Sequence, residues 1–176
     1  IGKPPFSKDP KDYAAAAEML KKVRPSVDRF SSSGYISDLA AGGLCAVVGY
    51  SGDINIARNR AIEGKTKQDV LALVPSTGSM IFFDTMAIPK DAKNVDEAHQ
   101  FINYILRPEV HASLTNTVFY ANPNKASLKF VKPEVANNKT VFLPPEDLKK
   151  MFVSETVAQD VRRIQTRTFT SFRAGK

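Results

Sequence analysis

Leu44-Cys45-Ala46-Val47-Val48-Gly49 is the stretch that decides the fold class, and Tyr50-Ser51-Gly52-Asp53 follows it directly. The first six residues are of strand length and show no alternation of apolar and polar side chains, which is typical of a strand covered on both faces. The next four turn into a helix that carries Ile54, Ala57 and Ala61 on one face and ends at Gly64. This order predicts an α/β fold with a parallel sheet, in which ligands bind where strands meet helix N-termini.

Two further strands are predicted downstream of this unit. Residues 70–74 form a second buried strand, and a turn at 75–78 leads into a longer strand over residues 80–88. The interior of that strand carries Asp84 among Ile81, Phe82, Phe83 and Met86. A carboxylate in such a strand needs a partner, because burying an unpaired charge is costly. Asp84 is therefore a candidate functional residue.

Apolar residues at helical spacing predict further helices before and after these strands. The first helix ends at Arg24-Pro25, and its apolar face is Tyr13, Ala16, Ala17, Leu20 and Val23. The second helix is short. It follows candidate caps at residues 31–34, runs through Leu39 and Ala40, and ends at Gly42-Gly43. A capping box of Asn94 and Glu97 begins the helix 95–106, whose apolar face is Ala98, Phe101, Ile102 and Ile105. Another helix begins at Arg107-Pro108 and runs through Leu114. An amphipathic helix at the end of the chain has its apolar face at Val157, Val161, Ile164, Thr168 and Phe172.

The composition of the chain is typical of a folded globular protein. The chain has 176 residues, 43% of them hydrophobic, and its 25 Lys and Arg against 18 Asp and Glu give a formal net charge of +7. These values exclude wholesale disorder, and no apolar run approaches a membrane span. A single Cys45 makes no intramolecular disulfide. Because the chain opens on Ile1-Gly2-Lys3 without an initiator Met or a signal peptide, we expect a processed or truncated product.

Sequence patterns of enzymes fail here. Gly64-Lys65-Thr66 resembles the end of a phosphate-binding loop, but Asn59 stands where that pattern needs Gly. Residues 49–53 resemble a nucleophile elbow, but Asp53 stands where the last Gly belongs. One Cys and two separated histidines, His99 and His111, do not supply a usual zinc site. We therefore expect no enzymatic activity, no metal and no cofactor.

The net positive charge raises nucleic acid as an alternative partner, because phosphate neutralisation dominates such binding. The basic residues are scattered, however, and no recognition motif accompanies them. Arg162, Arg163, Arg167 and Arg173 are interpreted as a solvated helix face. Residues 138–140 match a glycosylation sequon, which is a short pattern that often arises by chance. A basic nucleic-acid-binding domain remains the alternative of a different class, and a steep salt dependence of DNA binding would identify it.

Aromatic and acidic residues gather at the predicted element ends. They are Tyr50 and Asp53 beside the strand–helix turn, Phe82 and Asp84 two apart on a strand, and Tyr120 in a loop. Carboxylates bind ammonium groups, and aromatic rings attract cations and cover methylenes, so two carboxylates suit a cation at each end of an aliphatic rod. Each residue also has a structural interpretation: Tyr50 and Phe82 as core, Asp53 as a helix N-cap, and Tyr120 as a satisfied buried phenol.

The sequence resembles a known family over nearly its whole length. The matching segments are residues 30–39 (Phe-Ser-Ser-Ser-Gly-Tyr-Ile-Ser-Asp-Leu), 49–53, 80–84 (Met-Ile-Phe-Phe-Asp), 101–110 and 118–122. They resemble the putrescine-binding proteins of bacterial polyamine ABC transporters, in order and at matching spacings. The resemblance implies a type II periplasmic binding protein with two lobes, of which this chain is about the C-terminal half.

The resemblance also implies domain boundaries, ligand and partners. Residues 1–81 and 131–176 would belong to one lobe and 82–130 would complete the other, with hinge crossings near Phe82 and Phe130. Asp53 and Asp84 would bind the ammonium groups of putrescine, or of a related polyamine such as spermidine, while Tyr50, Phe82 and Tyr120 would cover its methylenes. The family usually has Trp where Tyr50 stands, which leaves the choice of polyamine open.

The implied location is the periplasm, and the implied partner is the permease in the inner membrane. No nucleic acid is expected. Within the same fold, the alternative ligand is another cationic solute such as an amino acid, and competition between ligands would separate the two.

Overall fold

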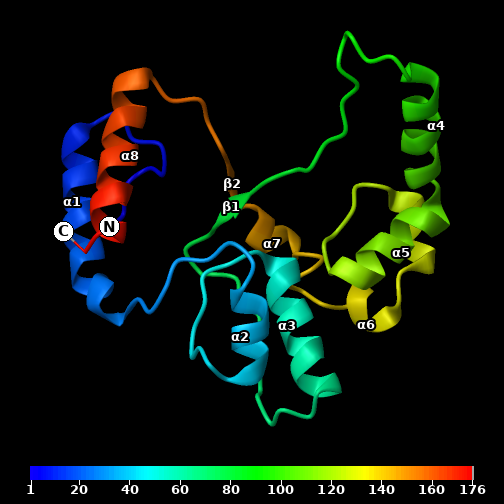
Figure 1. The fold of residues 1–176 in the computed structure, drawn as a ribbon, viewed down its shortest axis with the longest axis horizontal. Coiled ribbons are helices and arrows are strands. Elements are labelled where there is room, and N and C mark those ends of the chain that lie inside the picture. Colours follow the sequence, from blue (N-terminus) through cyan, green and yellow to red (C-terminus); the bar gives the residue numbers. More distant parts are fainter. Residues whose placement is uncertain (176) are drawn as a thin grey trace. The chain divides into compact units, whose positions relative to one another are not determined.

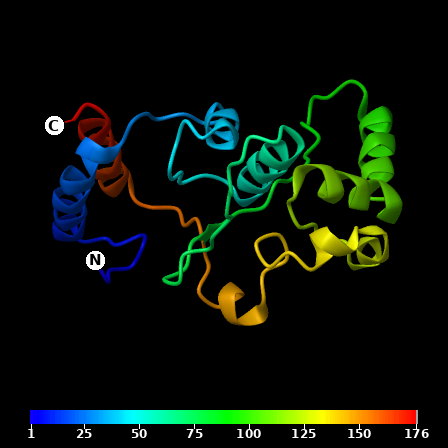
Figure 2. The same cartoon turned by 90° about the horizontal axis from the view of Figure 1, so that it is seen from below.

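The computed structural model describes residues 1–175. The elements of these residues are shown in Figure 1 and, turned by 90°, in Figure 2. They divide into two compact units: unit 1 comprises Ile1–Ser31 and Ser154–Lys176, and unit 2 is the continuous stretch Ser32–Val153. The predicted lobes, 1–81 with 131–176 and 82–130, and the crossings near Phe82 and Phe130 stay a prediction.

Unit 1 is built on two helices from opposite ends of the chain, α1 (Pro10–Val23) and α8 (Gln159–Arg173), which lie side by side (Figure 1). The Asp9 side chain caps α1 by accepting a hydrogen bond from the Lys11 amide at 2.9 Å. Tyr13 links the helices, because its phenol donates to the Ser7 carbonyl at 2.7 Å and accepts from Gln165 Nε2 at 3.2 Å. The predicted first helix and the predicted amphipathic helix at the end of the chain are therefore confirmed.

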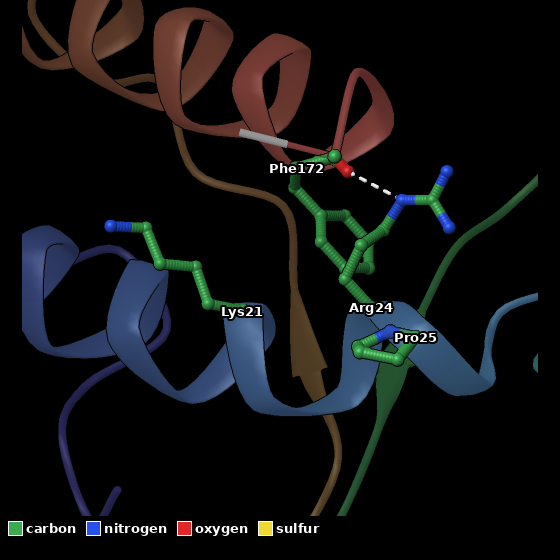
Figure 3. A pocket seen from close by; sticks show the side chains of 5 residues that line it. Lys21, Arg24, Pro25 and Phe172 are labelled. Carbon is green, nitrogen blue, oxygen red and sulfur yellow. Dashed lines mark hydrogen bonds between the residues drawn. The ribbon is translucent and has the colours of Figure 1, made fainter.

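Arg24 closes the C-terminal end of α8. It lies in the short 3₁₀ helix η1 (Arg24–Ser26), and its Nε donates to the Phe172 carbonyl at 3.0 Å (Figure 3). Its two other nitrogens donate to the carbonyls of Val27 at 3.1 Å and Arg173 at 3.3 Å. The bonds to Phe172 and Arg173 satisfy carbonyl groups that a helix end leaves without a partner within the helix. A hollow of about 530 Å³ beside them is lined by Lys21, Arg24, Pro25, Phe172 and Gly175.

Unit 2 contains most of the remaining helices in two clusters. Its elements are α2 (Tyr35–Ala41), α3 (Ser51–Glu63), β1 (Met80–Ile81), α4 (Val95–Ile105), α5 (Pro108–Val118), η2 (Lys125–Phe130), α6 (Pro133–Ala136), α7 (Pro145–Leu148) and β2 (Phe152–Val153). Helices α2 and α3 pack around Ala40, Ala57, Ala61 and Val70. Helix α5 packs with the segments after it around Ala112, Val131, Val135 and Val141. These two apolar clusters hold the helices whose ends form the candidate site.

The sheet is much smaller than the sequence predicts. Among the described residues it consists of β1 and β2, paired in parallel with Met80 opposite Phe152 and Ile81 opposite Val153. The predicted strands 44–49 and 70–74 are wrong, since both lie outside any strand, and the predicted strand 80–88 is confirmed at Met80–Ile81 alone. Val48 is fully exposed and Leu73 is 83% exposed. An apolar extended segment becomes a strand only where another strand bonds to it, and no described segment pairs with these.

The positions of the predicted helices are confirmed, but their predicted side-chain caps are not. Helices α2 to α5 lie where the apolar spacing predicts them, and Gly42, with φ of 82°, ends α2 as expected. The capping box of Asn94 is wrong, because α4 begins after Asn94 without a side-chain hydrogen bond, and α2 begins after Gly34 in the same way. Within residues 1–175, no helix is long and apolar enough to cross a membrane.

Candidate functional site

The N-terminus of α3 positions the first carboxylate. Tyr50 is the residue before the helix, with extended backbone angles, and Asp53 lies in the first turn. The interpretation of Asp53 as the N-cap is therefore wrong, because Tyr50 occupies that position. A carboxylate in the first turn is still favoured there, since the backbone N–H groups and the helix dipole make that end positive.

Two tyrosine phenols hold the Asp53 carboxylate, one on each oxygen. Tyr35 Oη donates to Asp53 Oδ2 at 2.5 Å, and Tyr120 Oη donates to Asp53 Oδ1 at 3.0 Å. Tyr35 is the first residue of α2, and Tyr120 follows the residue that caps the end of α5. Three segments distant in sequence thus meet at one half-buried carboxylate. Each oxygen keeps further accepting capacity, because an ionised carboxyl accepts about four hydrogen bonds in all.

Two glycines allow the tyrosines to approach so closely. A Cβ atom added at Gly52 would lie 2.2 Å from Cε2 of Tyr120, and one added at Gly49 would lie 2.8 Å from Cε2 of Tyr35. Both distances are below any van der Waals contact, so the two rings lie against bare backbone. Gly49 and Gly52 therefore decide whether the phenols reach Asp53.

The segment before and after Tyr120 is fixed by local structure. Phe119 ends α5 in the left-handed region with φ of 58°, which is uncommon for a bulky residue and turns the chain sharply. After the turn, Asn122 Nδ2 donates to the Thr115 hydroxyl at 2.8 Å, and Ser127 Oγ donates to Asn122 Oδ1 at 2.8 Å. Thr115 and Ser127 are fully buried. These bonds return the chain to α5 and hold Tyr120 at the start of the turn.

Tyr50, just before α3, forms an exposed aromatic pair with Phe82. The rings of Tyr50 and Phe82 meet edge to face, with centroids 5.5 Å apart and planes at 74°. Tyr50 is 49% exposed and Phe82 43% exposed. The interpretation of both rings as core residues is therefore wrong. They offer apolar faces that a ligand can cover.

Asp84 stands apart from the other predicted site residues. It lies two residues beyond Phe82 in an extended segment and is exposed. The prediction of a carboxylate buried in a strand is wrong, because the chain leaves the sheet after Ile81. No ion pair or hydrogen bond joins Asp84 to another residue in the described part of the chain. The structure thus joins Tyr50 with Phe82 and Asp53 with Tyr120, and leaves Asp84 free.

The phenols at Asp53 titrate far above neutral pH. Burial, reinforced by the hydrogen bond to the Asp53 carboxylate, raises the pKa of Tyr35 to about 12. The same two causes, in the same order, raise the pKa of Tyr120. Burial disfavours the phenolate, and a neighbouring negative charge disfavours it further. Both tyrosines therefore stay protonated and able to donate to Asp53 at physiological pH.

Two contributors to this site were missed from the sequence. One is Tyr35, which is 5% exposed and whose phenol also accepts a hydrogen bond from the Tyr50 amide at 3.3 Å. The other is Asn55, 3% exposed and two residues after Asp53. Asn55 Nδ2 donates to the Ser51 carbonyl and to the Thr140 hydroxyl, both at 2.9 Å. Tyr35 lies in a segment that carries the family resemblance, while nothing in the sequence marks Asn55.

The same network explains the apparent sequon at residues 138–140. Asn138 Nδ2 donates to Asn55 Oδ1 at 2.9 Å, and Asn138 Oδ1 accepts from the Thr140 amide at 2.9 Å. The two asparagines and Thr140 therefore pin the start of α3 to the segment after α6. These side chains serve packing inside unit 2. No group of three potential metal ligands lies together within residues 1–175.

Comparisons with known proteins identify the family of the chain. The family model of bacterial extracellular solute-binding proteins matches residues 2–143. The putrescine-binding periplasmic protein PotF of Escherichia coli is 43% identical over 177 aligned residues, which cover 100% of this chain and 48% of PotF. The putrescine-binding periplasmic protein SpuD of Pseudomonas aeruginosa is 39% identical, with 100% of this chain and 48% of SpuD covered. The chain thus spans about half the length of these relatives.

A solved structure supports the fold. The spermidine/putrescine ABC transporter substrate-binding protein PotD of Streptococcus pneumoniae superposes with a TM-score of 0.72 and 25% sequence identity, covering 97% of this chain and 51% of PotD. The predicted family and the type II periplasmic binding protein fold, present here in part, are therefore confirmed. This chain belongs to the bacterial extracellular solute-binding proteins, within which its relatives bind putrescine and spermidine.

Proposed function

We propose that this chain is the C-terminal part of a solute-binding protein that delivers a polyamine, in the first place putrescine, to an ABC importer. The observation that carries the proposal is the Asp53 carboxylate, held by two phenols in the first turn of the helix that Tyr50, one ring of an exposed aromatic pair, precedes. The names of PotF and SpuD as putrescine-binding proteins support it. No bond is made or broken in this function, so we propose no catalytic step.

The chemistry of the site fits a diamine. An ammonium group would donate charge-assisted hydrogen bonds to the free lone pairs of Asp53. The rings of Tyr50 and Phe82 would cover methylene groups and attract the cation through their faces. Asp84, exposed and without a partner in the described chain, would bind the second ammonium. Closure of two lobes at hinges near residues 82 and 130 would enclose the ligand.

The distribution of charge removes an apparent conflict between a positive protein and a cationic ligand. Twelve of the 25 Lys and Arg residues and six of the 18 Asp and Glu residues lie in unit 1, so this unit carries +6 of the net +7. Unit 2, which holds all five predicted site residues, carries only +1. Exposed charges are screened over about 8 Å at physiological salt, so nearby carboxylates dominate the field at the ligand.

Partner and location follow from the same proposal. The relatives are named periplasmic binding proteins, which supports a periplasmic location for the whole protein. Its partner would be the permease of an ABC importer in the inner membrane. Spermidine is the second candidate ligand, because a relative from Escherichia coli with 36% identity is named a spermidine/putrescine-binding protein.

Isothermal titration calorimetry of putrescine into the full-length protein tests the proposal. We expect saturable binding with one site, and displacement by spermidine but not by arginine. Saturable arginine binding that putrescine does not displace would instead assign the site to amino acids. Absence of heat and of any thermal stabilisation by putrescine would overturn the proposal. The same titration on residues 1–176 measures how much of the site this half of the protein supplies.

A further inference from the structure

Tyr35 is the buried centre of the candidate site, although none of its atoms need touch a ligand. Its phenol donates to Asp53 Oδ2 at 2.5 Å and accepts from the Tyr50 amide at 3.3 Å. Tyr35 is 5% exposed, whereas Asp53 is half-buried and Tyr50, whose backbone amide bonds to the phenol, is 49% exposed. One hydroxyl therefore ties the residue that would bind the ammonium to the residue that would cover the methylenes.

The backbone around Tyr35 is shaped to admit its ring. Gly49 leaves space that any Cβ would fill, since the ideal Cβ position is 2.8 Å from both Cε2 and Cζ of Tyr35 and 2.9 Å from its oxygen. Gly49 has no positive φ that would by itself require glycine. Glycine is therefore required at position 49 by the space that the Tyr35 ring occupies where its phenol approaches the Tyr50 amide.

Packing alone does not account for the phenol. The apolar cluster between α2 and α3 consists of Ala40, Ala57, Ala61 and Val70 with Ile36, Leu39 and Ile54, and does not include Tyr35. Phenylalanine would fill the same space. The hydroxyl adds only the two hydrogen bonds, and both go to residues of the candidate site.

We propose that Tyr35 is a positioning residue for polyamine binding, which fixes the Asp53 carboxylate and the Tyr50 backbone in one arrangement before the ligand arrives. This inference rests on the proposed function and deepens it. A carboxylate already oriented loses less freedom when it binds an ammonium, so the affinity gains from preorganisation. Without the phenol, Asp53 keeps Tyr120 on one oxygen and is free to turn about its remaining torsions.

The test uses Tyr35→Phe in the full-length protein, with putrescine affinity measured by calorimetry. Hydrogen bonds to charged groups contribute enough that we expect the affinity to fall by about tenfold. Tyr13→Phe is the matched control, because the Tyr13 phenol, like that of Tyr35, donates one hydrogen bond and accepts another, but it lies in unit 1. We expect Tyr13→Phe to change the affinity by less than twofold.

A double-mutant cycle with Asp53→Asn separates positioning from a general loss of structure. If Tyr35 acts through Asp53, Tyr35→Phe changes the affinity by less than twofold in the Asp53→Asn background. An equal tenfold loss in both backgrounds would overturn the inference, as would full affinity in Tyr35→Phe alone. Because the unmodified protein is titrated alongside, failure of the proposed function appears separately, as an absence of putrescine binding before any substitution is made.

Discussion

Gly52 and Tyr120 approach so closely that a Cβ atom on Gly52 would lie 2.2 Å from the tyrosine ring. Gly52→Ala therefore forces the ring or the start of α3 to move, and Tyr120 loses its hydrogen bond to Asp53. Overpacking of this kind costs about 1–3 kcal/mol. We expect the free energy of unfolding, measured in urea, to fall by that amount and putrescine affinity to fall with it.

Gly43→Ala is the control for this substitution. Its Cβ would lie 3.4 Å from the Asp38 carbonyl oxygen, which is an ordinary contact distance, and its φ is not positive. We expect a change in stability of less than about 0.5 kcal/mol, as for substitutions that touch no special feature. If Gly52→Ala were as mild as Gly43→Ala, the arrangement of Tyr120 over α3 would be wrong.

The two carboxylates should differ in what their removal costs. Asp84 is exposed and without a partner in the described chain, so Asp84→Asn should leave stability unchanged and weaken putrescine binding at least tenfold, or about 1.4 kcal/mol. Asp53 accepts two phenol hydrogen bonds, so Asp53→Asn should weaken binding and lower the unfolding free energy by about 1–3 kcal/mol. Calorimetry and urea unfolding on the same two variants measure both effects. An unchanged dissociation constant in Asp84→Asn would remove Asp84 from the site.

The helices could be predicted from the sequence, whereas of the predicted strands only Met80–Ile81 is confirmed, for a physical reason. Helix positions depend on signals within a few residues of the chain. These signals are the spacing of apolar residues and the helix-end residues Pro10, Gly42 and Pro108. A strand depends on a distant segment that bonds to it. Residues 44–49 carry the pattern of a buried strand, yet no described segment pairs with them. The sequence pattern describes what such a segment can do when a neighbouring strand is present.

The candidate site was predictable in its residues but not in its organisation. The family resemblance indicates Tyr50, Asp53, Phe82, Asp84 and Tyr120. The role of Tyr35 depends on α2 packing against α3, and that of Asn55 on a segment more than 80 residues away. A tyrosine at a helix start and an asparagine inside a helix have no distinctive pattern. Both are recognised only once their hydrogen-bond partners are known.

Asn55 should be important for stability rather than for binding chemistry. Asn55→Ala removes hydrogen bonds to the Ser51 carbonyl, the Thr140 hydroxyl and the Asn138 amide. Polar groups left buried without partners cost about 1–3 kcal/mol, so we expect a loss of that size in urea unfolding. Asn59→Ala, one turn further along α3, is the control and should cost less than half as much. Equal losses in the two variants would show that the network contributes nothing beyond helix propensity.

Replacing Arg24 by lysine should destabilise unit 1. Its guanidinium donates to three carbonyls, of Phe172, Val27 and Arg173, and lies 5.6 Å from the centre of the Phe30 ring. A lysine ammonium cannot reproduce this planar set of donors. We expect Arg24→Lys to lower the unfolding free energy by about 1–2 kcal/mol, since at least one helix-end carbonyl loses its partner. Arg163→Lys on the exposed face of α8 is the control and should have no measurable effect.

High pH should weaken unit 2 in a defined range. The pKa of Tyr35 is raised from 10.0 to about 12 by burial and by the bond to Asp53, and that of Tyr120 is raised for the same reasons. A raised pKa means that the folded state holds its proton more tightly than the unfolded state does. The stabilisation is complete below pH 10 and declines as the pH rises from about 10 through about 12.

The measurement is urea unfolding of the full chain between pH 9 and pH 12, compared with the variant Tyr35→Phe/Tyr120→Phe. Other groups titrate in this range, so the difference between the two proteins is the quantity that reports on the phenols. We expect the unmodified chain to lose more stability than the variant over this interval, because only the unmodified chain has these two phenols, which ionise at lower pH when the chain is unfolded than when it is folded. Parallel curves would mean that the two phenols ionise equally easily in the folded and unfolded states. The hydrogen bonds to Asp53 would then not exist in solution.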